Sequence, residues 1–320
     1  TVIAAHEQER VPHIALADNG GHALSDLLAR GPLDVVDALD IGAQVAETLG
    51  RIHRAGIIHK DVKPSNVILD ESGRALLLDF GIAGELDRET HRDLGAGRLE
   101  GTLAYMSPEQ TGRVNRPVDL RSDLYALGIT IYEALTGTLP FPETDPAEVV
   151  HGHVARDPVP PSQWRDGLPS VVDAIVLRLL AKSAERRYQS GAGLAADLRR
   201  CITGLRQAGR VEGFVLGQGD RPERFVMPSK LYGRDAELGA LAAAFARVTE
   251  GDRELVLVLG HSGVGKTALV HELHRNIAER RGSFALGKFD QFRRNVPYAS
   301  IIQAFGELAG RLLTEPEDRV

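Results

Sequence analysis

The sequence has little or none of several features that define common classes of protein. It contains one cysteine, Cys201, so no disulfide can form within the chain, and we expect a reducing, cytoplasmic setting. No apolar run approaches the ~20 residues of a membrane span, and the first residues do not form a signal peptide. Acidic residues outnumber Lys and Arg by 44 to 38, whereas a nucleic-acid binder normally has a basic excess. We therefore predict no nucleic-acid partner and no membrane segment in this chain.

The bulk composition is that of a globular protein. The chain has 320 residues, of which 43% are hydrophobic and 26% charged, so there is ample material for a core. At roughly 150 residues per domain, this length predicts two domains. The sequence does not begin with Met, and its last residues, LLTEPEDRV, come just after a helix-like run. We expect a piece of a longer protein, truncated at both ends.

Apolar spacing gives the expected elements of the first part of the chain. A buried strand is predicted at 14–17 and a hairpin at 67–69 and 75–78, around the turn DESG. Helical spacing predicts helices at 33–55, 122–136, 171–182 and 191–205. Residues 206–228 are rich in Gly, Pro and charge, which is typical of a linker.

The last part of the chain alternates helix and strand patterns. The predicted order is a helix at 234–248, a strand at 254–260, a helix at 266–280, a strand at 284–289 and a helix at 299–313. This alternation is typical of an α/β domain with a parallel sheet.

A dense polar cluster lies between two apolar runs at 56–70. It contains His59, Asp61, Lys63 and Asn66, and Asp79 lies at the far end of the hairpin that follows. Folding the hairpin back brings Asn66 close to Asp79, and this pair of oxygen ligands suits Mg²⁺ with phosphate. Asp61 can then accept a proton from an attacking hydroxyl, and Lys63 can offset charge on a transferring phosphoryl group. These are the parts that phosphoryl transfer requires.

These motifs resemble those of the eukaryotic-type protein kinases. HKDVKPSN (59–66), DFG (79–81) and SPE (107–109) follow the order and spacing of that family's catalytic loop, metal-binding tripeptide and closing Glu. Lys63-Pro64 resembles the Ser/Thr branch. The resemblance covers about 1–205 and implies a hinge and C-terminal lobe, with backbone groups of Ala17 and Asn19 holding adenine.

The same resemblance implies roles for residues further along the chain. Asp123, in SDLYALG, would anchor the catalytic loop, and Arg187 would pair with Glu109. Residues 101–109 would dock the substrate. Two features depart from the family: Lys60 stands where Arg is usual, and no G-x-G-x-x-G opens the chain. From Lys60 we expect only a weak dependence on activation-loop phosphorylation. From the missing Gly-rich loop we expect this piece alone to be inactive, whereas the intact parent could be a kinase.

A second nucleotide site is predicted at 260–267. Gly260-x-x-x-x-Gly265-Lys266-Thr267 follows a predicted strand and precedes a predicted helix, which is the P-loop pattern in its required context. The glycines, with Gly263, let backbone amides surround phosphates. Lys266 would reach the β- and γ-phosphates, and Thr267 would ligate Mg²⁺.

The stretches around this loop resemble AAA-like and STAND-type signalling ATPases. Residues 232–245 resemble their entry helix, and 287–305 resemble a stretch of large bacterial proteins that fuse a Ser/Thr kinase, an ATPase and often a sensor histidine kinase. No apolar run ending in two acidic residues follows Thr267. We therefore expect 229–320 to be an incomplete, N-terminal part of the ATPase domain.

The predicted fold is a mainly α kinase-like C-terminal lobe with small β-hairpins, followed by a linker and a partial α/β P-loop NTPase domain. The leading function is ATP-dependent phosphorylation of protein Ser/Thr residues in bacterial signal transduction, with ATP and Mg²⁺ as cofactors. Downstream sensor histidine kinase domains are candidate partners. One alternative is a non-catalytic kinase-like scaffold with an ATP-sensing switch. A plain P-loop ATPase with an unrelated helical partner would leave the kinase motifs unexplained.

Overall fold

The computed structural model describes most of the chain, and the chain divides into two compact units near residue 228. We refer to them as the first and the second unit. The described residues are 2–8, 11–16, 20–86, 102–114, 116–222, 233–261, 264–273, 276–277, 280, 282, 284–285, 287 and 298–312.

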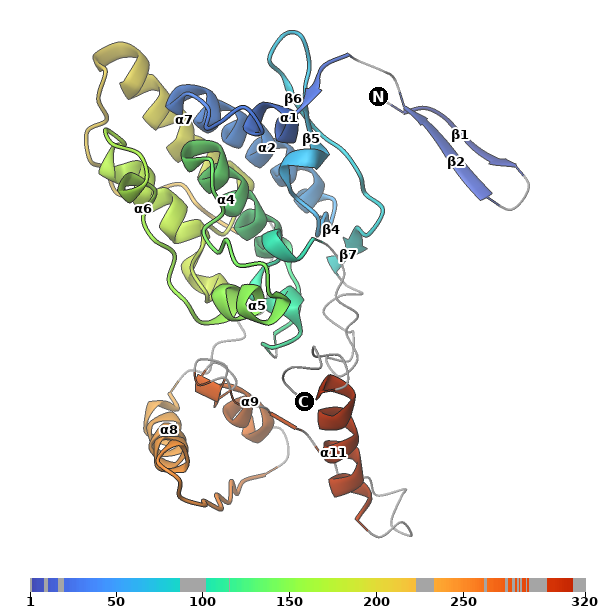
Figure 1. Ribbon diagram of the computed structural model, residues 1–320, viewed down its shortest axis with the longest axis vertical. Coiled ribbons are helices and arrows are strands. Elements are labelled where there is room, and N and C mark those ends of the chain that lie inside the picture. Colours follow the sequence, from blue (N-terminus) through green and yellow to red (C-terminus); the bar gives the residue numbers. More distant parts are fainter. Residues whose placement is uncertain are drawn as a thin grey trace. The chain divides into compact units, whose positions relative to one another are not determined.

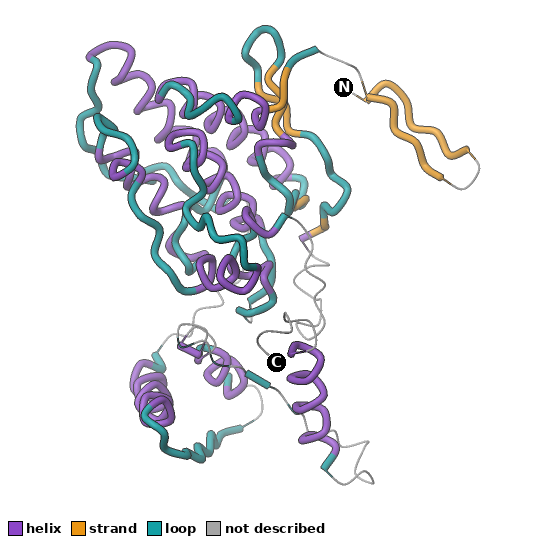
Figure 2. The backbone as a smooth tube through the Cα atoms, in the orientation of Figure 1, coloured by secondary structure: helices purple, strands orange, loops and turns teal. Residues whose placement is uncertain are grey.

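The first unit is built mainly from helices (Figures 1 and 2). Its α-helices are α1 (Leu24–Leu28), α2 (Val35–Arg54), α4 (Leu120–Thr136), α5 (Pro146–Val154), α6 (Ser170–Leu179) and α7 (Gly191–Ala208). Short 3₁₀ turns lie at Pro64–Asn66, Leu103–Tyr105, Pro108–Thr111, Pro161–Gln163 and Ala184–Arg186. The predicted helices at 33–55, 122–136, 171–182 and 191–205 are confirmed, with ends that differ by a few residues.

Short antiparallel strands complete the first unit. β1 (Val2–Gln8) pairs with β2 (Val11–Leu16), and β4 (Ile57–Ile58) pairs with β7 (Gly84–Glu85). A three-stranded sheet has the order β3 (His22–Ala23), β5 (Val67–Leu69), β6 (Ala75–Leu77). The β5–β6 pair is the predicted hairpin, with Val67 opposite Leu77 and Leu69 opposite Ala75. This hairpin carries the chain from residue 66 back to residue 78, beside the polar cluster.

Helix α4 runs through the centre of the first unit. Asp119 caps its start, because its side chain accepts a hydrogen bond from the Arg121 amide, and Gly137 ends it in the left-handed conformation. Every residue from Leu120 to Tyr132 is buried. A helix that is buried all round must have neighbours on all sides, and α4 contacts α2 and α6.

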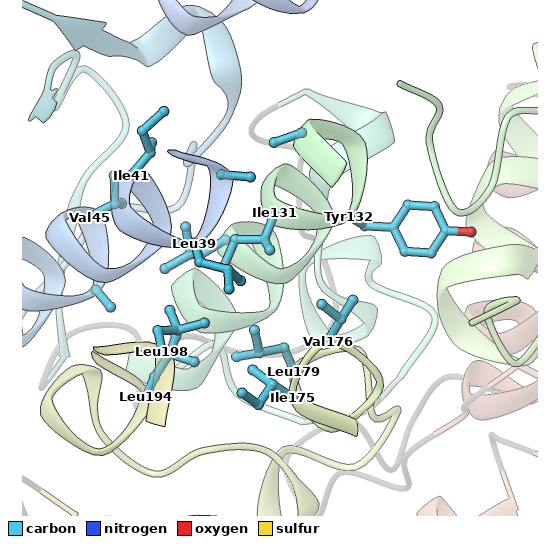
Figure 3. Packing of buried hydrophobic residues seen from close by; sticks show 14 of the residues in the cluster. Leu39, Ile41, Val45, Ile131, Tyr132, Ile175, Val176, Leu179, Leu194 and Leu198 are labelled. Carbon is cyan, nitrogen blue, oxygen red and sulfur yellow. The ribbon is translucent and has the colours of Figure 1, made fainter. Parts of the chain in front are cut away.

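The core of the first unit lies between these helices. Figure 3 shows side chains from α2, α4, α6 and α7 meeting in one cluster. The labelled members are Leu39, Ile41, Val45, Ile131, Tyr132, Ile175, Val176, Leu179, Leu194 and Leu198. The cluster extends to Val62 and Val67, on either side of residues 63–66, so the polar loop is fixed at both ends by the core.

Part of the predicted linker, 206–228, packs against the first unit. Val211, Phe214 and Leu216 pack against the main core cluster. The Gly217 amide donates to Asp197 at 2.7 Å. Residues 211–220 are therefore attached to the first unit, because a few apolar side chains anchor a stretch whose composition is otherwise polar.

The second unit contains helices α8 (Asp235–Thr249), α9 (Lys266–His271) and α11 (Ala299–Leu312). The predicted helices at 234–248 and 299–313 are confirmed. The predicted strand at 254–260 is wrong: these residues have no regular structure, and Leu255, Leu257 and Leu259 are exposed. A strand requires a hydrogen-bonded neighbour, and no strand lies beside 254–260 in the described part of this unit.

The α/β sheet expected for the second unit is therefore absent from its described residues. Of the predicted strand at 284–289, residues 284–285 and 287 are described and lie in no strand. No helix in the described ranges is long and apolar enough to cross a membrane.

Candidate functional site

The catalytic-loop motif is held by a buried carboxylate from α4. The Asp123 side chain accepts hydrogen bonds from the His59 amide at 2.9 Å and the Lys60 amide at 2.7 Å. It also contacts His53 Nε2, at the end of α2, at 2.8 Å. Asp123 is fully buried and lies in the first turn of α4, where the helix dipole favours a negative charge. Lys60 has a left-handed backbone, with φ 68°. This conformation is consistent with the His59 and Lys60 amides both pointing at the Asp123 carboxylate.

His59 connects this loop to the end of the hairpin. Its Nε2 lies 3.0 Å from the Leu78 carbonyl, and the Asp61 amide lies 3.3 Å from its Nδ1. These two contacts fit a neutral ring that donates from Nε2 and accepts at Nδ1. The ring also meets Phe80 edge-on at 4.7 Å between centroids. One buried imidazole therefore joins the loop of Asp61 to the tripeptide that contains Asp79.

Asp61 lies at the centre of a closed set of polar contacts. Lys63 Nζ approaches Asp61 Oδ2 at 2.6 Å and donates to Thr102 Oγ1 at 2.6 Å. The Thr102 amide and hydroxyl each donate to Asp61 Oδ1 at 3.2 Å. Asn66 Nδ2 donates to Asp61 Oδ2 at 3.1 Å and to its carbonyl at 2.8 Å. The Asp61 side chain keeps 11% of its surface exposed, so another hydroxyl can reach it.

The electrostatics keep this carboxyl ionised. Burial acts to raise the pKa of Asp61, but the hydrogen bond and charge of Lys63, with the bonds from Thr102 and Asn66, outweigh it. The pKa therefore lies below its ordinary value. At neutral pH Asp61 is a carboxylate that can accept a hydrogen bond or a proton.

Asn66 and Asp79 fit a divalent cation bound with phosphates. The Leu78 amide donates to the Asn66 carbonyl at 2.8 Å, which places Asp79 one residue from a direct contact with Asn66. Asn66 uses its side-chain NH₂ on Asp61, which leaves its amide oxygen for another partner. Asp79 has a left-handed backbone, φ 63°, and its Oδ1 accepts from the Gly81 amide. An amide oxygen and one carboxylate suit Mg²⁺, which takes its remaining ligands from phosphate and water.

A buried ion pair anchors the end of the segment that is predicted to dock the substrate, 101–109, which we call the docking segment. Glu109 forms two hydrogen bonds with Arg187, at 2.7 and 2.9 Å, and both residues are buried. Burial acts to raise the pKa of Glu109, but the Arg187 charge and hydrogen bonds outweigh it, so the pKa is lowered. The next residue, Gln110, donates to the Lys60 carbonyl at 2.8 Å. Ser122, in α4, also donates to Glu109 at 2.6 Å, so the end of this segment is tied both to α4 and to the catalytic loop.

A pocket of about 380 Å³ opens beside Lys63 and Thr102. Tyr105 and Glu133 line one part of it, where the Tyr105 hydroxyl donates to Glu133 at 2.6 Å. Burial raises the pKa of Glu133, although the Tyr105 hydrogen bond opposes this. The other residues that line the pocket are Ser25, Leu28, Ala29, Pro64, Ser65 and Gly137. The pocket gives a second molecule access to the side of the catalytic loop that carries Lys63.

The P-loop motif lies at the start of α9 in the second unit. Lys266 Nζ donates to the carbonyls of Gly260 and His261, both at 2.8 Å. Gly265 has φ 88°, which favours glycine. A Cβ on Gly260 would lie 2.8 Å from a methyl group of Val264, so a side chain there needs that methyl to move. Thr267 is exposed. The Lys266 side chain therefore lies over the backbone of its own loop.

The structure brings together Asp61, Lys63 and Asn66, and Leu78, the residue before Asp79, is hydrogen-bonded to the Asn66 backbone. Ala17, Asn19 and Gly263 lie outside the described residues. Sequence reasoning missed the direct role of Thr102, although it included that residue in the docking strip 101–109. It also missed His53, whose ring nitrogen contacts Asp123.

Comparison with known families assigns both parts of the chain. The protein kinase domain family model matches residues 3–195. The chain belongs to the protein kinase family. A second model, the AAA ATPase domain, matches residues 230–320. The predicted fusion of a kinase with an AAA-like ATPase is confirmed, and the first unit is from here on the kinase lobe.

Three named relatives illustrate what this chain is similar to. Serine/threonine-protein kinase PknB of Mycobacterium leprae is 40% identical over 195 residues, covering 61% of this chain and 31% of the relative. A probable serine/threonine-protein kinase of Corynebacterium efficiens is 37% identical over 226 residues, covering 69% of this chain and 34% of the relative. Hybrid signal transduction histidine kinase G of Dictyostelium discoideum is 28% identical over 369 residues, covering 88% of this chain and 11% of the relative. The chain thus spans between about a tenth and a third of these relatives' lengths.

Proposed function

We propose that the full-length protein transfers the γ-phosphoryl group of ATP to Ser or Thr hydroxyls of a protein substrate. The observation that carries this proposal is the contact set of Asp61, in which Lys63, Thr102 and Asn66 converge on one reachable carboxylate. The bacterial Ser/Thr kinases among its relatives support the choice of substrate class.

Each residue has a defined task in this reaction. Asp61 orients the acceptor hydroxyl and takes its proton. Lys63, already within 2.6 Å of both Asp61 and Thr102, stabilises negative charge on the phosphoryl group. Asn66 and Asp79 would hold Mg²⁺, which neutralises phosphate charge when bound. The docking segment and the pocket beside Tyr105 would position the substrate chain.

A transfer assay on the full-length protein tests the proposal. We specify that protein because a protein kinase covers the phosphates of ATP with a Gly-rich loop, and no G-x-G-x-x-G opens this chain. The expected products are phosphoserine and phosphothreonine in a protein substrate, formed only with ATP and Mg²⁺. If ATP binds but no phosphate is transferred, the lobe is a non-catalytic scaffold.

The lysine at position 60 leads to a prediction about regulation. Arg pairs bidentately with a phosphorylated residue, whereas Lys provides a single point charge. Treating the full-length protein with a phosphatase is therefore expected to change its kinase activity by less than about tenfold. Activity is measured before and after treatment, with a heat-inactivated phosphatase as the control. A larger loss would show that activation-loop phosphorylation is required despite Lys60.

For the second unit we propose ATP binding at Gly260, Gly263, Gly265, Lys266 and Thr267, with Thr267 as the Mg²⁺ ligand. Lys266→Ala is expected to weaken ATP binding to this unit at least about tenfold, because a charge-assisted hydrogen bond to phosphate is lost. Calorimetric titration measures this. Arg253→Ala removes an exposed cation from the same unit and serves as the control. Equal affinities for the two variants would contradict the assignment.

We further propose that the parent is a cytoplasmic bacterial signal-transduction protein. The single cysteine of this chain, Cys201, is buried in α7, and a chain with one cysteine forms no internal disulfide. The hybrid histidine kinase relative supports a parent in which sensor histidine kinase domains follow the ATPase domain.

A further inference from the structure

Residues 211–220, here called the strap, turn back along α7. Helix α7 ends at Gly209, which has a left-handed backbone. A Cβ added to Gly204, near the end of α7, would lie 3.0 Å from the Arg210 carbonyl. A Cβ added to Gly193, near its start, would lie 2.8 Å from the Asp220 Cα. Glycine weakens a helix. Here the two glycines lack a Cβ, and this allows the chain to approach α7 closely near both ends of the helix.

Apolar contacts hold the middle of the strap. Phe214 and Leu216 pack against the main core cluster, and the Arg200 guanidinium lies 4.2 Å from the Phe214 ring centroid. Arg178, on α6, donates to the Leu216 carbonyl at 2.9 Å. The strap thus joins α6 and α7 on the outside of the kinase lobe.

Asp220 ends the strap with a buried carboxylate. Its side chain is 1% exposed. It accepts hydrogen bonds from the Gln189 amide and the Ser190 hydroxyl, both at 2.8 Å, and from Arg178 at 3.3 Å. Ser190 is the N-cap of α7, so Asp220 adds its charge where the helix dipole favours it.

The loop that Asp220 holds is the one that carries Arg187. Gln189 Nε2 donates to the Arg187 carbonyl at 2.8 Å, and Gln189 Oε1 accepts from Arg121 at 3.0 Å. Arg187 in turn pairs with Glu109. A continuous chain of contacts therefore leads from the strap to the end of the docking segment.

We propose that Asp220 is a positioning residue for the kinase lobe: it fixes loop 180–190 and, through the Arg187–Glu109 pair, the substrate-docking segment. The strap lies beyond residue 195, where the match to the kinase family ends. The chain continues from the strap through residues 223–232 to the second unit, so the strap is also that unit's covalent attachment to the lobe. The kinetic part of this proposal rests on the proposed kinase function.

Hydrogen exchange tests the positioning without any assay of activity. In the full-length protein, Asp220→Ala is expected to raise amide exchange about tenfold or more in 180–190 and in 107–112, because a buried charged acceptor is lost. Asp220→Asn, which keeps the size of the side chain, should give a smaller increase in the same two segments. Glu212→Gln removes a charge from an exposed site on the strap and should leave both segments unchanged. Unchanged exchange in 107–112 for both Asp220 variants would overturn the proposal.

Steady-state kinetics separate positioning from general destabilisation. For Asp220→Asn we expect the KM for the protein substrate to rise about fivefold or more, with the KM for ATP unchanged and kcat within about twofold. A variant that only loses folded protein would instead show a lower kcat and unchanged KM values, and this result would overturn the proposal. If the wild-type protein transfers no phosphate, the proposed function fails, and the exchange measurement alone decides the role of Asp220.

Discussion

Asp61→Asn is expected to lower the rate of phosphoryl transfer by the full-length protein about 10²- to 10⁴-fold. The amide has nearly the same size as the carboxylate and can keep the hydrogen bonds from Thr102. It cannot accept the proton of the acceptor hydroxyl, and it loses the charge that faces Lys63. The KM for ATP should change little, because Asn66 and Asp79 remain. Single-turnover transfer of labelled phosphate to a protein substrate measures the effect.

The matched control for this variant is Asp166→Asn. Asp166 is exposed in the same lobe, so the same chemical change there should leave the rate within about twofold. A rate for Asp61→Asn within about threefold of wild type would refute the assignment of Asp61 as the catalytic carboxylate.

Arg187→Met is expected to destabilise the kinase lobe by about 3–5 kcal/mol, because it leaves Glu109 charged and buried without its partner. Arg187 also donates to the carbonyls of Ala181 and Lys182, and its guanidinium stacks on Tyr125 at 4.8 Å. The midpoint and slope of denaturant unfolding give the free energy of unfolding. Trp164, the only tryptophan of this chain, lies in the kinase lobe and reports on it by fluorescence.

Two further variants show whether burial of the pair is the cause. Arg116→Met breaks the more exposed pair with Glu185 and should cost about 1 kcal/mol or less. The double variant Glu109→Gln/Arg187→Met should recover part of the loss, because the unpaired buried charge is gone. Equal losses for Arg187→Met and Arg116→Met would contradict a dominant role for the buried pair.

The sequence predicted the parts of the site that depend on local spacing. Asp61, Lys63 and Asn66 lie close together in the chain, and the β5–β6 hairpin that brings Asp79 back has a clear turn signal, DESG. The contact between Thr102 and Asp61 joins residues 41 positions apart, and no spacing rule predicts such a contact. Family resemblance, and not periodicity, supplied the Glu109–Arg187 pair and the anchor Asp123.

One wrong prediction and one incomplete prediction have the same physical origin. The strand predicted at 254–260 has the right apolar residues, but a strand also needs a neighbour, and pairing is not encoded in a single segment. The linker predicted at 206–228 has the composition of a free connection, yet Phe214 and Leu216 anchor it to the core. In both cases the deciding contact lies in a distant part of the chain, so local composition was not enough.

The match to the kinase family model and the first folded unit end at different places in this chain. A recombinant lobe that stops at residue 195 would cut α7 within its second turn and expose the face of α2 that α7 covers. A lobe that stops at Gly209 would leave the Phe214 binding surface open to water and to other molecules. A recombinant kinase lobe should therefore end after Pro222, so that it keeps the strap that packs against its core.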